Sequence, residues 1–304
     1  MQAATPWIDV DARLLRTWPL PQVSPEADKE ERGRVLVIAG SREIPGAALL
    51  AATAALRAGA GKLVIATAQS VALKLALAMP EARVIALPET AAGAFAAHAI
   101  DLLDECAQGA DAVLIGPGLM DEDGTDAFVA RLLPMLAHAP VILDALAMNV
   151  VRAGPRLNQP VLLTPHAGEM AHLCALSKEA VLADPEQAVI AASREWNAVV
   201  ALKGAATLIA TPDGGRWRHE AEHPGLATSG SGDVLAGLIA GLAAQQVPLE
   251  QACAWGVVLH ALAGKELARR LGPLGYLARE LPGEIPRLLR RLRPPGQLRL
   301  SPRE

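Results

Sequence analysis

Short apolar runs rich in β-branched residues alternate along this chain with longer Ala- and Leu-rich segments of helical period. Such runs are typical of strands that are apolar on both faces, and the segments between them are long enough for crossover helices. Strands of this kind are buried in a mainly parallel sheet with helices on both sides. The pattern therefore predicts an α/β fold with strands at 34–39, 62–66, 83–87, 112–115, 141–143, 161–163 and 199–202.

The spacing of apolar residues predicts helices between these strands, among them 46–58, 123–137 and 185–196. Residues 207–210 and 216–218, joined by a Pro-Asp-Gly-Gly turn at 212–215, indicate a hairpin at one edge of the sheet. Helices are then expected at 234–245, 249–271 and 276–292. We expect one domain over residues 33–304, preceded by a polar lead-in segment over 1–32.

Composition favours a soluble metabolic enzyme. The chain has 304 residues, of which 52% are hydrophobic, so it can bury a large core. Its net charge of −4 and an aromatic content of only 3% argue against a nucleic-acid partner. No signal peptide or membrane-length apolar span is visible, and the cysteines Cys106, Cys174 and Cys253 lack metal-ligand spacing. We therefore expect a cytoplasmic protein with buried thiols and no contact with membranes.

A glycine-rich turn over residues 223–233 runs into the apolar helix expected from Val234. The start of a helix presents free backbone N–H groups and the positive end of the helix dipole, which together bind anions. Asp233 places a carboxylate beside this site. It could take a proton from a hydroxyl that attacks a bound phosphate, or it could only complement the helix dipole.

Most of the unusual residues follow the carboxyl ends of predicted strands. In an open parallel sheet ligands bind at that edge, so these loops should converge on one crevice. Each loop also has a simpler interpretation: tight turns for the glycines, an ordinary loop histidine for His166 and a surface lysine for Lys203. Asp144 ends a buried strand and needs a partner, a metal or a ligand. The loops are Gly40-Ser41, Gly116-Pro117-Gly118, Asp144-Ala145, 164–169 and 203–207.

The order and spacing of several motifs resemble the ADP-dependent NAD(P)H-hydrate dehydratases, over roughly residues 30–290. The motifs are Gly33-Arg-Val-Leu-Val-Ile-Ala-Gly-Ser41, Pro45-Gly-Ala-Ala48, Ala58-Gly-Ala-Gly-Lys-Leu-Val64, Ile115-Gly-Pro-Gly118, Leu143-Asp-Ala145, Thr164-Pro-His-Ala-Gly-Glu169, Leu202-Lys-Gly204 and Gly230-Ser-Gly-Asp233. The resemblance implies a ribokinase-like three-layer sandwich, in which helices flank a mostly parallel central sheet. It also implies a homo-oligomer, a tetramer in this family.

The resemblance further implies the roles of individual residues. The hydrated nicotinamide nucleotide would contact Ala47, Gly118, His166 and Asp233, with Asp233 as the catalytic base. The adenine nucleotide would contact Lys203, Gly204, Ala205, Ala206, Thr207, Gly230, Ser231 and Gly232. Mg²⁺ and a phosphoryl donor, ADP or ATP, are the implied cofactors, and the sequence does not identify the magnesium ligands.

The implied reaction is the repair of hydrated NADH or NADPH in the S configuration. Asp233 would deprotonate the ring hydroxyl as it attacks the terminal phosphoryl group, while the N–H groups of Gly230 to Asp233 neutralise the developing charge. Loss of phosphate would restore the reduced ring and leave AMP or ADP. Two other functions use the same residues: a ribokinase-like kinase of a small alcohol or vitamin precursor, and a nucleotide-binding regulatory protein without turnover.

Overall fold

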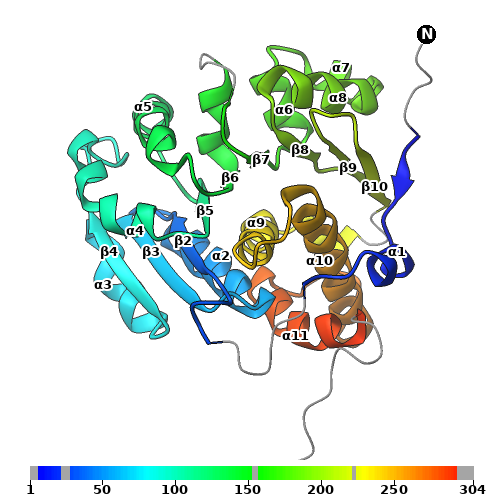
Figure 1. Cartoon of the computed structure of the whole chain (residues 1–304), viewed down its shortest axis with the longest axis horizontal. Coiled ribbons are helices and arrows are strands. Elements are labelled where there is room, and N and C mark those ends of the chain that lie inside the picture. Colours follow the sequence, from blue (N-terminus) through cyan, green and yellow to red (C-terminus); the bar gives the residue numbers. More distant parts are fainter. Residues whose placement is uncertain (1–5, 22–27, 153–156, 221–223, 293–304) are drawn as a thin grey trace, which may run out of the picture.

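The computed structural model describes residues 6–21, 28–152, 157–220 and 224–292. Within these ranges one sheet contains the strands in the order β1-β10-β9-β8-β7-β6-β5-β2-β3-β4, and β9 alone runs antiparallel to its neighbours (Figure 1). The predicted mostly parallel α/β fold is therefore confirmed. The strands are β1 (Ile8–Asp9), β2 (Arg34–Ile38), β3 (Lys62–Ala68), β4 (Ala82–Leu87), β5 (Ala112–Ile115), β6 (Val141–Leu143), β7 (Val161–Leu163), β8 (Val199–Leu202), β9 (Ala206–Ala210) and β10 (Arg216–Glu220).

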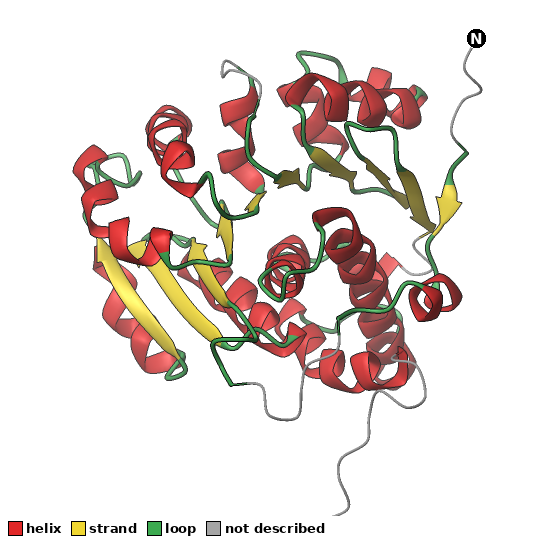
Figure 2. Ribbon diagram, viewed as in Figure 1, coloured by secondary structure: helices red, strands yellow, loops and turns green. Residues whose placement is uncertain are grey.

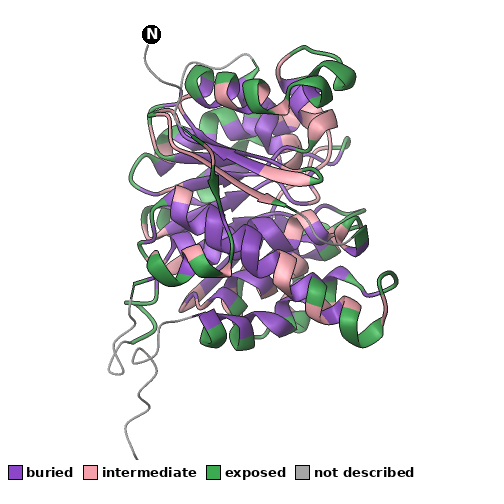
Figure 3. Ribbon diagram, turned by 90° about the vertical axis from the view of Figure 1, so that its right-hand side faces the viewer, coloured by how far each residue is buried: buried purple, intermediate pink, exposed green. Residues whose placement is uncertain are grey.

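Helices cover both faces of the sheet and produce three layers (Figure 2). One face carries α4 (Asp104–Gln108), α5 (Glu122–Leu132), α6 (Ala167–Leu173), α7 (Lys178–Ala183) and α8 (Pro185–Trp196). The other carries α2 (Pro45–Ala58), α3 (Gln69–Ala78), α9 (Ser231–Ala243), α10 (Leu249–Leu271) and α11 (Leu281–Leu292). The buried hydrophobic side chains form one contiguous cluster between these layers (Figure 3).

Helix α9 lies at the centre of its layer because two glycines allow it to approach α2 closely. A Cβ atom at Gly237 would lie 2.1 Å from the carbonyl oxygen of Ala51, and one at Gly241 would lie 2.4 Å from that of Ala55. Helix α9 is buried along most of its length, as its uninterrupted apolar sequence requires. This packing fixes the amino terminus of α9 at the carboxyl edge of the sheet.

The segment before β2 shares the core of the domain. Strand β1 pairs with β10, and α1 (Ala12–Thr17) follows it. Leu15 is fully buried, Trp18 stacks on Trp217 with ring centroids 5.7 Å apart, and the Trp255 indole donates to the carbonyl oxygen of Trp18 at 2.9 Å. The predicted edge position of the β9–β10 hairpin is therefore wrong, because β1 covers its outer strand.

Three helix boundaries differ from the prediction by three or more residues. The helix expected over 123–137 ends at Leu132 and continues as a 3₁₀ turn, Leu133–Leu136, in which Pro134 lacks a backbone donor. Short 3₁₀ helices also occur at η1 (Ala97–Leu102), η3 (Ala145–Val151), η4 (Pro224–Leu226) and η5 (Ala278–Glu280). The last helix begins at Leu281 after η5, and α9 begins at Ser231 rather than Val234.

The sequence predicts buried thiols, and the structure confirms this for two of the three cysteines. All three thiols are free; Cys106 and Cys253 are buried, whereas Cys174 is half-buried. Burial raises the pKa of the Cys174 thiol to about 11, so it is protonated at neutral pH. None of the helices in the described ranges is long and apolar enough to cross a membrane.

Candidate active site

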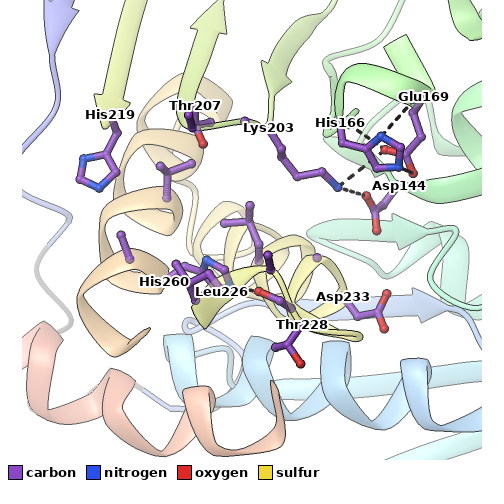
Figure 4. Close-up of a pocket in the computed structure, with 18 of the residues that line it drawn as sticks. Asp144, His166, Glu169, Lys203, Thr207, His219, Leu226, Thr228, Asp233 and His260 are labelled. Carbon is purple, nitrogen blue, oxygen red and sulfur yellow. Dashed lines mark hydrogen bonds and ion pairs between the residues drawn. The ribbon is translucent and has the colours of Figure 1, made fainter. Parts of the chain in front are cut away.

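The loops at the carboxyl ends of β6, β7 and β8 meet the amino terminus of α9 and one side of α10 around a cavity of about 820 Å³ (Figure 4). Most of the residues predicted for the site line this cavity: His166, Lys203, Gly204, Ala205, Thr207, Ser231, Gly232 and Asp233. Ala206 and Gly230 adjoin these residues but are not part of the cavity wall, and His223 lies outside the described residues. The crevice expected at the carboxyl edge is therefore present.

Asp144 and Lys203 form a buried ion pair at the floor of the cavity. The Lys203 Nζ lies 3.2 Å from Asp144 Oδ1, which also accepts a hydrogen bond from the Thr164 hydroxyl at 2.6 Å. Glu169 Oε2 lies 3.9 Å from the same ammonium group. Burial lowers the pKa of Lys203, but attraction to Asp144 and Glu169 outweighs this and raises it overall. The lysine is therefore a fixed positive charge, and it is the partner that a carboxylate at the end of a buried strand requires.

The first turn of α9 supplies an anion cradle that lacks one of the four predicted N–H donors. Ser231 N–H donates to the carbonyl oxygen of Thr228 at 3.2 Å, and Val234 N–H donates to that of Gly230 at 3.1 Å. Among the described residues no acceptor is found for the N–H groups of Gly230, Gly232 and Asp233. These three groups are therefore the donors that remain for a bound phosphate.

Asp233 lies in this first turn with its carboxylate beside the cradle. Burial and repulsion by Asp144 raise its pKa to about 6, and the nearby Lys203 only partly offsets this effect. The ammonium group is close to the cradle, because a Cβ atom at Gly232 would lie 3.4 Å from Lys203 Nζ. The arrangement places a base of raised pKa and a fixed cation on either side of an anion site, which suits proton removal during phosphoryl transfer.

His166 both lines the cavity and begins α6. Its Nδ1 accepts hydrogen bonds from the N–H groups of Gly168 and Glu169, at 3.0 and 3.2 Å, and Glu169 Oε2 accepts from the His166 N–H at 2.7 Å. This is a capping box in which the ring takes the place usually held by a serine or threonine hydroxyl. Because Nδ1 accepts, the neutral ring carries its proton on Nε2.

Gly118 and Ala47 pack against each other rather than lining the large cavity. A Cβ atom at Gly118 would lie 2.7 Å from the Ala47 Cβ and 2.6 Å from the carbonyl oxygen of Ile44. The φ angle of Gly118, +69°, is also one that favours glycine. The two residues lie at the end of β5 and the start of α2, so they share the carboxyl edge with the cavity.

Sequence reasoning missed several residues of the cavity wall. Glu169, Leu226 and Thr228 were seen only as parts of longer motifs, and His219 and His260 were not considered. A polar residue inside the apolar helix run Trp-Gly-Val-Val-Leu-His-Ala-Leu-Ala was the one signal that could have identified His260. No local signal distinguishes the others, because they reach the cavity through tertiary packing.

Comparison with known proteins identifies the family of this chain. A sequence profile described as NAD(P)H-hydrate dehydratase matches residues 35–287. The ADP-dependent (S)-NAD(P)H-hydrate dehydratase of Xanthomonas campestris pv. campestris is 49% identical over 283 residues, which cover 93% of this chain and 96% of that protein. The chain spans about half the length of related bifunctional NAD(P)H-hydrate repair enzymes, for example 52% of the one from Moorella thermoacetica.

Solved structures agree with this comparison. The ADP/ATP-dependent NAD(P)H-hydrate dehydratase from Bacillus subtilis, co-crystallized with ATP/Mg²⁺, superposes with a TM-score of 0.82 at 31% identity, covering 95% of this chain and all of that one. A ribokinase-like superfamily protein from Enterococcus faecalis gives a TM-score of 0.82 at 26% identity, covering 94% of this chain and 96% of that one.

The sheet, its flanking helices and the site at its carboxyl edge define a ribokinase-like enzyme. Within that class the chain belongs to the NAD(P)H-hydrate dehydratase family.

Proposed function

We propose that this protein is an ADP- or ATP-dependent dehydratase that restores NADH and NADPH from the S-epimers of their hydrates. The observation that carries the proposal is the position of Asp233, whose carboxylate adjoins the free N–H groups of the α9 cradle and whose pKa is raised to about 6. A hydroxyl group that reaches this carboxylate also reaches a phosphate in the cradle. The relatives named above support the choice of substrate.

These positions support the following reaction. Asp233 takes the proton of the ring hydroxyl as its oxygen attacks the terminal phosphorus of ADP or ATP. The N–H groups of Gly232 and Asp233 and the Lys203 ammonium stabilise the negative charge that develops on the phosphoryl oxygens. Phosphate is a far better leaving group than hydroxide, so the lone pair of the ring nitrogen expels it. Loss of a neighbouring proton restores the dihydropyridine ring, and AMP or ADP is released.

The contacts of the two substrates remain part of this proposal. We assign the nucleotide to Lys203, Gly204, Ala205, Ala206, Thr207, Gly230, Ser231 and Gly232. The hydrate would contact Ala47, Gly118, His166 and Asp233. The apolar side chains of Leu226 and Val257 in the cavity wall suit a nucleoside, and the charged pair Asp144 and Lys203 suits phosphates.

Mg²⁺ fits the donor set of the cavity. Within the described ranges no cluster of three metal-ligating side chains is found, which is compatible with a cation held by one or two carboxylates and substrate phosphates. Thr164 and Lys203 both donate to Asp144 Oδ1, which leaves Oδ2 as the oxygen that would hold the cation. When bound, Mg²⁺ would neutralise charge on the phosphate oxygens.

We also propose the compartment, the domain organisation and the assembly of the enzyme. Free cysteines support a reducing cytoplasm, and one shared hydrophobic cluster supports a single domain. Exposed leucines at 271, 274 and 277 support a homo-oligomer, for which we expect a tetramer. Light scattering of the purified protein tests the assembly.

Product analysis tests the function against the alternative of a small-alcohol kinase. The protein is incubated with S-configured NADPH hydrate, ADP and Mg²⁺, and the reduced nicotinamide, AMP and phosphate are quantified. We expect the three products in equal amounts. A stable phosphorylated product without recovery of reduced nicotinamide would favour the kinase.

A further inference from the structure

A buried histidine lies directly behind the anion cradle. His260, on α10, is 8% exposed and its neighbours along the helix are apolar. A buried imidazole requires a hydrogen-bond partner, and the Nε2 atom of His260 lies 3.0 Å from the hydroxyl oxygen of Ser231. Both residues line the cavity, in which Figure 4 labels the histidine.

The imidazole of His260 is neutral at the pH of the cell. Burial lowers its pKa to about 4, and repulsion by Lys203 adds to this effect. A neutral ring carries one N–H group, and a hydroxyl carries one hydrogen. If Nε2–H donates to the serine oxygen, the serine hydrogen is directed away from the histidine and toward the cavity.

We propose that His260 is a positioning residue, which holds the Ser231 hydroxyl as a further phosphate donor beside the free backbone N–H groups of the cradle. The inference rests on the proposed function, because it assumes that the cradle binds the transferring phosphoryl group. The backbone N–H of Ser231 already bonds Thr228, so the side chain is the only donor that this residue can offer.

A double-mutant cycle tests the coupling of the two side chains. Ser231→Ala and His260→Leu should each lower kcat with ADP about tenfold, because each removes the oriented donor. His260→Leu should lower kcat less than about twofold in the Ser231→Ala background. His260→Gln, whose amide can donate where Nε2 lies, should retain most of the activity. Equal losses in both backgrounds, or a Gln variant as impaired as Leu, would overturn the proposal.

Two controls keep the outcome interpretable. Thermal unfolding of each variant establishes that it folds, and if His260→Leu does not, the comparison of His260→Gln with Ser231→Ala carries the test. ADP affinity measured by calorimetry does not require turnover of the hydrate. If the wild type binds ADP but does not restore reduced nicotinamide, the proposed function fails, whereas the coupling of Ser231 and His260 can still be measured as ADP affinity.

A second cavity, of about 500 Å³, lies on the other side of the 228–230 turn. Thr228 lines both cavities, and the second is also lined by Gly46 and Leu50 of α2 and by Ala278 and Arg279 of η5. The two cavities approach each other near the carboxylate of Asp233. A Cβ atom at Gly230 would lie 2.5 Å from Leu50, 3.3 Å from Ala278 and 3.8 Å from Asp233 Oδ2.

We infer that this second cavity takes the adenosine half of the hydrated dinucleotide, and that Arg279 pairs with one of its phosphates. This inference also rests on the proposed function. When the ring hydroxyl lies at Asp233, the rest of the dinucleotide needs a space of its own, because the large cavity is assigned to the phosphoryl donor. Gly46 adjoins Ala47, which is assigned to the same substrate. The guanidinium group is exposed and its fork geometry matches a phosphate.

Substrate kinetics test the second cavity. Arg279→Ala should raise the KM for hydrated NADPH about tenfold and leave kcat and the KM for ADP within twofold. Arg287→Ala removes an exposed charge from α11 and serves as the control. An equal rise with hydrated NADH identifies the pyrophosphate, and a rise with hydrated NADPH alone identifies the 2′-phosphate. Unchanged KM values for both hydrates, or a change in oligomeric state, would overturn the inference.

Discussion

Replacing Asp233 by asparagine should separate activity from stability. The folded protein holds this carboxylate in an environment that disfavours its charge, because burial and Asp144 raise its pKa from an ordinary 3.8 to about 6. A difference of about two pKa units corresponds to about 3 kcal/mol of unfavourable interaction when the group is ionised. Solvent reaches part of the side chain, so we expect the neutral amide to recover about 1–2 kcal/mol.

The sign of the effect depends on pH in a defined way. Because the pKa of Asp233 is higher in the folded protein, its contribution to stability is complete below the unfolded value of 3.8 and is lost as pH rises through about 6. The stability difference between the variant and the wild type should therefore be smallest near pH 4. It should grow to its full size above pH 7, because only the wild type carries the charge.

Urea unfolding of both proteins at several pH values measures this difference, and the dehydration assay measures turnover. We expect Asp233→Asn to bind ADP, to gain stability at neutral pH and to lose turnover by about three orders of magnitude. A variant that is less stable than the wild type at pH 8, or a stability difference that does not change with pH, would refute the electrostatic reasoning. Turnover near the wild-type rate would exclude Asp233 as the base.

Further predictions concern the cavity wall. In the wild type, kcat/KM should fall as pH decreases through about 6, because Asp233 must be ionised to accept a proton; a flat profile from pH 5 to 8 would contradict this. Lys203→Met should lower the free energy of unfolding in urea by about 3–5 kcal/mol, because it leaves Asp144 buried and unpaired, and Asp144→Asn should restore part of the loss. Gly204→Val should raise the KM for ADP far more than that for the hydrate, since even a Cβ atom there would lie 3.2 Å from the carbonyl oxygen of Ala206; unchanged ADP affinity in a folded variant would place the nucleotide elsewhere. His166→Ala should weaken hydrate binding and lose about 1 kcal/mol of stability through the α6 cap, whereas His166→Asn should weaken binding alone, and wild-type hydrate binding in both would remove His166 from the site.

The regular part of the fold could be predicted because its signals are local. Runs such as Val199–Leu202 are apolar on both faces, and α8 begins and ends where its sequence predicts, with Asp184 as its cap and Pro185 at its first position. Strand β1 could not be predicted. It contains only two residues, and the contacts that hold its segment, such as Trp18 on Trp217, join parts of the chain that are far apart in sequence.

The candidate site was predictable to the extent that strand ends determine it. Asp144 and Lys203 meet because β6 and β8 flank β7, so their carboxyl ends lie at the same edge. Glu169 and His260 depend instead on where α6 starts and how α10 packs, which no short motif specifies. The extent of the anion cradle also depended on the structure, because the helix begins at Ser231 and uses one of the expected N–H groups internally.

The central claim is that Asp233 and the α9 cradle transfer a phosphoryl group to the ring hydroxyl of a hydrated nicotinamide. The most direct measurement follows the absorbance of reduced nicotinamide while the purified protein is mixed with S-configured NADPH hydrate, with and without ADP or ATP. We predict that absorbance returns only when the nucleotide is present, with one AMP or ADP and one phosphate released for each ring restored. Recovery without any nucleotide, or nucleotide consumption without recovery, would contradict the account.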